Sequence, residues 1–172
     1  MSGFFIALAL AACGQAHAPA PHQQAARDGW LYNAASETAR RFTGDVSIER
    51  QTLVFTKGAV LTTRILARRE PAEPIAQGGP SFSAAALGAP DVEIELRAVT
   101  RHNLEPGAPS LCPNGAAATF VALAYSQRST QLTLMVFNGD EAPGQSANKS
   151  WLCATYAYAA PDGVRTRQGV LL

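Results

Sequence analysis

The sequence predicts an all-β domain, a small antiparallel barrel or sandwich of about eight strands. Beyond Trp30 the chain is built of short runs of β-branched, aromatic and aliphatic residues, and turn-forming residues separate these runs. One stretch, AASETARR at 34–41, has helical propensity, and strands that continue from Trp30 and Tyr32 are the alternative there. The 172 residues, of which 47% are hydrophobic, suffice for one core, so we expect a single β domain over 30–172.

The chain begins with MSGFFIALALAAC, whose apolar part at 3–12 is far shorter than a membrane-spanning helix. It fits the core of a secretory signal peptide. The motif Leu10-Ala11-Ala12-Cys13 resembles the lipobox of bacterial lipoproteins. The resemblance implies that residues 1–12 are removed and that Cys13 carries fatty acyl chains, palmitate among them. Cleavage after Ala16-His17-Ala18, or a buried N-terminal segment, is the alternative.

The segment that follows Cys13 is expected to be a flexible tether over 13–29. It is rich in Ala, Pro and Gln and has no apolar periodicity. His17 and His22 lie in it without acidic or thiol companions, so we expect them to be solvated and not to bind metal. Gly14 follows Cys13 where similar inner-membrane lipoproteins often carry Asp, which implies a cell-envelope protein on the outer membrane, facing the periplasm.

Eight runs are expected to form strands. The first three are separated by short turns such as Lys57-Gly58 and should form a meander. The apolar runs ATFVALAY and QLTLMVF, joined by SQRST, should form a central hairpin. The last strand is expected after the turn Pro161-Asp162-Gly163. The runs lie at residues 44–50, 52–57, 59–66, 91–99, 118–125, 131–137, 151–158 and 163–172.

The strand expected at 91–99, DVEIELRAV, has two contrasting faces. We expect its apolar face to be buried and its charged face to be solvated, with the charges matched by Arg64 or Arg97 across the sheet. A metal site or acid pair is the functional alternative, but carboxylates two residues apart on a strand lie about 6.6 Å apart, too far to chelate one ion. The apolar face carries Val92, Ile94 and Leu96, and the other face carries Asp91, Glu93, Glu95 and Arg97.

A long connection rich in Pro and Gly separates Arg69 from Pro90. Connections of this length are often functional or disordered. We expect disorder or a segment that covers the barrel mouth, with a recognition loop as the alternative.

Once Cys13 is assigned to lipid, Cys112 and Cys153 remain as an even pair. We expect a disulfide between them, because an oxidising periplasm permits it, and closing about 41 residues would stabilise the fold by roughly 4 kcal/mol. Two buried free thiols are the alternative. The sequence has no CxxC pair or zinc-type cluster, so we expect no redox centre, metal or other cofactor.

Motifs of common enzymes are absent from the sequence. There is no G-x-S-x-G pentapeptide, and Gly78-Gly79 does not connect a strand to a helix as a phosphate-binding loop does. The net charge of +1 gives no broad attraction to nucleic acid. His102, near Glu105, is the one histidine within 30–172; we expect a plain loop histidine, with a general base as the alternative.

These features predict a non-enzymatic lipoprotein, held to the membrane by its lipid, that binds an envelope protein or another envelope component. One alternative is an inhibitor of lysozyme or another hydrolase, because small bacterial lysozyme inhibitors are similar in being β-barrel lipoproteins with a disulfide. Another is a carrier of a small apolar ligand, and a third is an enzyme built around His102. Aromatic side chains would line a carrier's pocket, although such residues more often fill a core; the candidates are Trp30, Trp151, Tyr156 and Tyr158.

Overall fold

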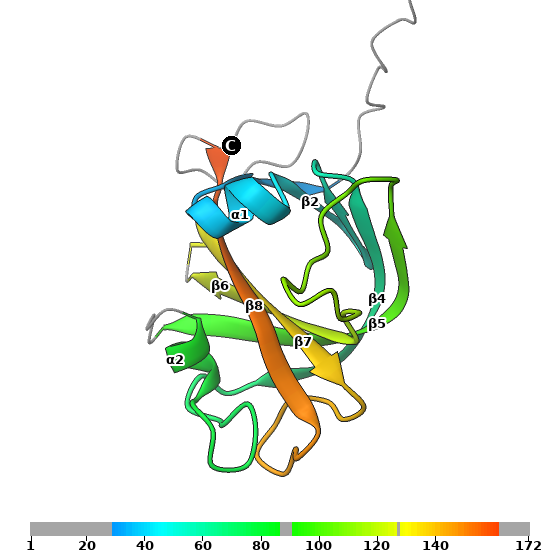
Figure 1. Ribbon diagram of the computed structural model, residues 1–172. Helices are drawn as coiled ribbons and strands as arrows, with labels where there is room; N and C mark the ends of the chain where they lie inside the picture. The colour runs from blue at the N-terminus through cyan, green and yellow to red at the C-terminus, as the bar shows by residue number, and fades with distance from the viewer. Residues whose placement is uncertain (1–28, 87–90, 127, 162–172) are drawn as a thin grey trace, which may run out of the picture.

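The computed structural model describes residues 29–86, 91–126 and 128–161. It is a closed barrel of eight antiparallel strands with two short helices (Figure 1). Strand order follows chain order, and the last strand pairs with the first. The all-β class is therefore confirmed, and of the two architectures it is the barrel. The elements are β1 Trp30–Ala34, α1 Glu37–Phe42, β2 Val46–Glu49, β3 Thr52–Phe55, β4 Ala59–Arg69, α2 Phe82–Ala85, β5 Val92–Leu104, β6 Phe120–Ser126, β7 Gln131–Gly139 and β8 Ser150–Ala159.

Most strands form where the sequence predicts them. The expected meander is β2–β3–β4, and the expected central hairpin is β6–β7. The ambiguous segment after Trp30 forms both alternatives, because β1 is followed directly by α1. Ser36 caps this helix by accepting a hydrogen bond from the Ala39 backbone N–H at 3.1 Å. The strand expected at 163–172 lies outside the described residues, and β1 supplies the eighth strand.

The barrel interior is filled by one apolar cluster. Its members come from strands all around the ring, which shows that the cluster lies inside the barrel. Its largest members are Tyr32, Tyr156 and Tyr158, which are almost fully buried. The Tyr158 hydroxyl bonds to Thr43 Oγ1 at 2.7 Å, and the Tyr156 hydroxyl donates to the Leu111 carbonyl. Burial raises the pKa of Tyr156 to about 12. Tyr156 and Tyr158 thus fill the core.

The connection between β5 and β6, residues 105–119, folds back into the barrel, and we call it the inner loop. Leu111 and Cys112 of this loop are fully buried within the interior cluster. Cys112 is joined to Cys153 of β8 by a disulfide, as expected, with their Cα atoms 5.3 Å apart. Ala39 of α1 joins the same cluster. The inner loop and α1 therefore close one end of the interior (Figure 1).

The connection between β4 and β5 packs outside the barrel, and we call its residues 70–86 the outer connection. Here Phe82 of α2 meets Phe137 of β7 edge to face, with ring centroids 6.4 Å apart. The expectation that this segment is disordered or covers the barrel mouth is wrong for residues 70–86, because they cover the outer face of β5–β7. Residues 87–90 of the predicted connection are outside the described part. The outer cluster comprises Ile75, Phe82, Ala86, Val92, Ile94, Leu96, Ala122, Ala124, Met135 and Phe137.

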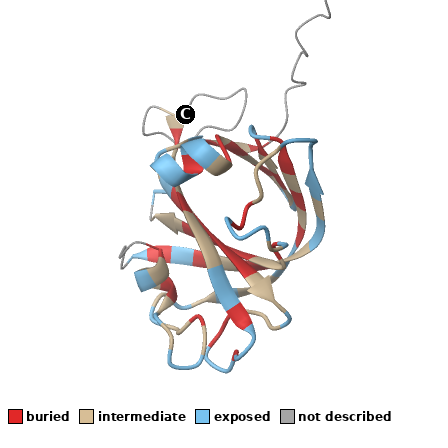
Figure 2. Cartoon of the chain, in the orientation of Figure 1, coloured by how far each residue is buried: buried red, intermediate tan, exposed pale blue. Residues whose placement is uncertain are grey.

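The two faces of β5 point in directions that the sequence did not indicate. The apolar face is buried, but it points outward, beneath the outer connection. The charged face points inward, because Glu95 and Arg97 lie opposite Leu123 and Val121 of β6, which belong to the interior cluster. The prediction of a solvated charged face is wrong for Arg97, which is 5% exposed. Figure 2 shows the alternation of buried and more exposed residues along these strands.

Candidate ligand-binding site

A cavity of about 690 Å³ lies at the end of the barrel away from the inner loop. The two ends of β5 show this arrangement, since Glu93, Glu95 and Arg97 near its start line the cavity while Leu104 at its end leads into the inner loop. We call this end the barrel mouth. The remaining lining residues come from β1, β2, β4, β6 and the turns beside them.

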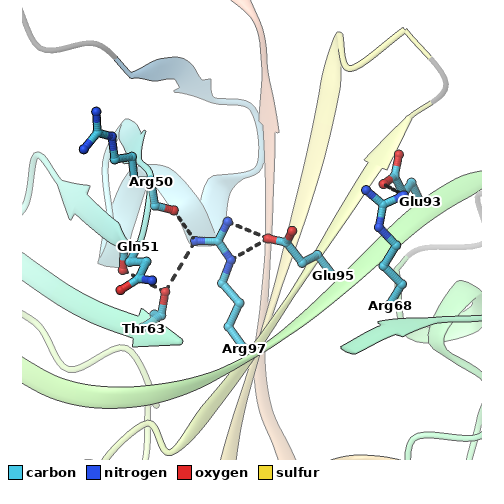
Figure 3. A network of polar contacts seen from close by, with 7 residues as sticks. All are labelled: Arg50, Gln51, Thr63, Arg68, Glu93, Glu95 and Arg97. Carbon is cyan, nitrogen blue, oxygen red and sulfur yellow. Dashed lines mark hydrogen bonds and ion pairs between the residues drawn. The ribbon is translucent and has the colours of Figure 1, made fainter. Parts of the chain in front are cut away.

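The deepest charged group of the cavity is the ion pair between Arg97 and Glu95. Arg97 Nε and one terminal nitrogen contact the same Glu95 oxygen, at 2.6 and 2.5 Å (Figure 3). The Arg97 side chain is 6% exposed and that of Glu95 is 20% exposed. Residues two apart on a strand share a face, so the sequence itself brings this pair together. Such charge-assisted hydrogen bonds are stronger when water is excluded.

Arg97 also fixes the turn between β2 and β3. Its other terminal nitrogen donates to the Arg50 carbonyl at 2.9 Å and contacts Thr63 Oγ1 at 3.4 Å. Thr63 in turn donates to the Gln51 carbonyl through its backbone N–H at 2.7 Å and its hydroxyl at 2.8 Å. The turn is thus held to β4 and β5, although Arg50 has a left-handed backbone with φ of 52°.

Two further arginines, Arg50 and Arg68, are among the residues that line the cavity. Arg68 of β4 contacts Glu93 at 2.7 Å, and these side chains are 77% and 58% exposed. The Arg50 side chain extends away from the Arg97 ion pair in Figure 3. Within the described ranges, the Arg50 guanidinium has no hydrogen-bond or ion-pair partner. The predicted partner Arg64 is exposed on β4 and does not line the cavity.

The cavity lining also includes apolar and aromatic side chains. Trp30 of β1 pairs with Ile48 of β2, and both side chains line the cavity with Tyr125 of β6. Ile48 is 3% exposed and belongs to the interior cluster, so the apolar wall continues into the core. The cavity therefore presents both charged side chains and apolar or aromatic ones, and the two kinds are neighbours where Tyr125 pairs with Glu93.

The other predicted site residues that the structure describes do not line this cavity. Trp151 on β8 is 55% exposed and does not line the cavity. His102 lies on strand β5 opposite Leu61, so its prediction as a loop residue is wrong. Burial lowers the pKa of His102, and its Nε2 is buried with no hydrogen-bond partner among the described residues. Cys13 lies outside the described part of the chain.

The described residues lack two features that would define the class of site. In the described part of the chain there is no group of three or more His, Cys, Asp or Glu residues that could hold a metal ion. Of the helices described, none has the length and apolar character that crossing a bilayer requires.

Comparison of the chain with protein-family models, with curated proteins and with solved structures finds no match. The fold and the cavity are therefore the basis for any functional conclusion.

Sequence reasoning missed the cavity, and one signal for it was present. Charged residues alternate with apolar ones along 91–97, and the last charged residue is Arg97. If such a face points into a barrel, the arginine must find hydrogen-bond or ion-pair partners there. Arg50 gave no such signal, because an arginine in a short turn is ordinary. Trp30 was considered as a pocket residue and does line the cavity.

Proposed function

We propose that this chain is a non-enzymatic binding protein of the bacterial cell envelope, and that its barrel mouth binds a small amphipathic molecule. The observation that supports this proposal is the cavity at the mouth, whose volume of about 690 Å³ lies in the range of small-molecule pockets. Barrels of eight strands can hold one small ligand in this way.

The polarity of the cavity favours an amphipathic ligand over a purely apolar one. Trp30, Ile48 and Tyr125 offer surface for a hydrocarbon or aromatic body. Arg50, together with the Arg97–Glu95 pair, offers hydrogen bonds that an entirely apolar molecule would leave unused. We therefore modify the carrier hypothesis: the expected ligand has a polar group as well as an apolar body.

The envelope location rests on the sequence together with the disulfide. The lipobox resemblance at Cys13 and the tether over 13–29 would hold the barrel close to a membrane, on the periplasmic side. Disulfides such as Cys112–Cys153 persist mainly in oxidising compartments. Binding to an envelope protein and inhibition of a hydrolase stay predictions. A protruding loop would support them, but the two long connections at 70–86 and 105–119 both pack against the barrel.

Fluorescent probe binding tests the cavity. The protein is titrated with neutral N-phenyl-1-naphthylamine and with its sulfonate, 8-anilino-1-naphthalenesulfonate. We expect saturable, one-site binding of at least one probe, weakened about tenfold by Trp30→Ala through loss of contact area. Trp151→Ala is the matched control, because Trp151 lies outside the cavity. Absence of saturable binding, or equal effects of the two variants, would refute the proposal.

The anchor is tested in the full chain. Cys13→Ser should move the protein from the membrane fraction to the soluble fraction and remove acyl mass from its mature N-terminus. A wild-type N-terminus without acyl mass would show that the envelope part of the proposal is wrong, and the binding part would stand or fall separately.

A further inference from the structure

We infer that the barrel mouth selects a small organic anion, with a carboxylate, sulfonate or phosphate group on an apolar body, and that the Arg50 guanidinium contacts the anionic group. This inference deepens the proposed function and depends on ligand binding in the cavity.

The charged residues that line the cavity do not balance. They are three arginines, Arg50, Arg68 and Arg97, and two glutamates, Glu93 and Glu95. Arg97 and Arg68 each contact one of these carboxylates. Within the described lining, the Arg50 guanidinium remains without an anionic partner. The lining residues therefore carry an excess of one positive charge.

The two paired arginines differ in their availability to a ligand. The buried Arg97 is held by Glu95, the Arg50 carbonyl and Thr63, so its role is to position the turn. The Arg68–Glu93 pair is largely exposed, and exposed pairs are weak. An anion that binds Arg50 therefore displaces no carboxylate, whereas one that binds Arg68 competes with Glu93.

The backbone that carries Arg50 is preorganised. Arg97 donates to the Arg50 carbonyl, and Thr63 donates twice to the neighbouring Gln51 carbonyl. Ligand binding therefore orders one side chain and does not have to order the turn. The planar guanidinium matches the oxygen geometry of carboxylates, sulfonates and phosphates. Trp30 and Tyr125, which also line the cavity, receive the apolar body.

The test compares the two naphthylamine probes, which share an aromatic body and differ in the sulfonate. At low ionic strength we expect the sulfonate to bind about tenfold more tightly than the neutral probe. Arg50→Gln should remove most of this preference and leave the neutral probe's affinity within about twofold. Arg64→Gln is the matched control, since it removes the same charge from an exposed site outside the cavity. Added salt should weaken the sulfonate alone.

Each outcome decides one of the two proposals. If the probes bind equally, and Arg50→Gln changes neither affinity, the site takes a neutral ligand and the anion inference is overturned while the proposed function stands. If Arg64→Gln weakens the sulfonate as much as Arg50→Gln does, the effect comes from net charge and the assignment to Arg50 is overturned. If neither probe binds, the proposed function itself fails. Circular dichroism and the thermal midpoint establish that each variant is folded.

Discussion

At the scale of single residues, Arg97 is a buried charge whose environment supplies its partners. Glu95, the Arg50 carbonyl and Thr63 Oγ1 accept its hydrogen bonds. Removing a charge from water is costly, and only good geometry with further hydrogen bonds offsets the cost. This residue therefore connects strand β5 to the β2–β3 turn and keeps the barrel mouth in shape.

Replacing Arg97 alone should destabilise the protein substantially. Arg97→Met leaves the Glu95 carboxylate and the Arg50 carbonyl without their donor, and we expect a loss of about 3 kcal/mol in the free energy of unfolding. The double variant Glu95→Gln/Arg97→Met should be at least as stable as the single one, because no unpaired charge remains. Urea unfolding at neutral pH measures both, and a loss below about 1 kcal/mol for the single variant would show that the pair is effectively solvated.

His102 should make stability depend on pH in a defined direction. Burial lowers its pKa below the ordinary value of 6.5, so the folded protein binds fewer protons than the unfolded chain just below that pH. Stability is therefore lost as the pH falls through 6.5, and the loss levels off below the folded-state pKa. His102→Gln should lose less stability between about pH 7.5 and 5.5 than the wild type does. Urea unfolding midpoints of both proteins at the two pH values test this, and an equal change in midpoint for the wild type and the variant would contradict it.

At the scale of elements, alternation predicted strands well but not the direction of their faces. The period of two along 91–99 identified β5 and its apolar face correctly. It gave no means of knowing that the outer connection would bury the apolar face from outside. Coverage of that face depends on Phe82 and Ile75, which lie in a stretch that sequence reasoning treated as a loop. Only the packed chain shows which face is inside.

The outer connection should depend on Phe82 for its attachment. Phe82 is fully buried and meets Phe137 edge to face. Phe82→Ala should therefore cost about 3–4 kcal/mol, through lost burial and the cavity it leaves. Gln77→Ala, at an exposed position of the same connection, is the control and should change stability by less than about 0.5 kcal/mol. Chemical denaturation measures both, and similar values would mean that the connection contributes little.

At the scale of the whole molecule, closure of the barrel creates the candidate site. Trp30 and Arg97 are far apart in the sequence, and they line one cavity because β8 pairs with β1 and completes the ring. Strand runs could be predicted one by one from local patterns, and the disulfide from the cysteine count. The cavity could not, because it depends on the tilt and closure of all strands together.

The disulfide should contribute strongly to global stability. In the chain-entropy model a bridge across a sequence separation of 41 residues contributes about 4 kcal/mol. Cys112→Ala/Cys153→Ala should lose a comparable amount. Reduction of the wild type by dithiothreitol under denaturing conditions should lower the refolding midpoint in the same way. Equal unfolding midpoints for the oxidised protein and the double variant would contradict this expectation.

The inner loop, with Leu111 and Cys112 packed inside the ring, closes the end of the barrel opposite the mouth. If the proposed function is right, a bound ligand would enter and leave through the mouth, and the described residues leave it no path through the opposite end. Exchange would follow the departure rate of the resident molecule, however abundant its competitor became.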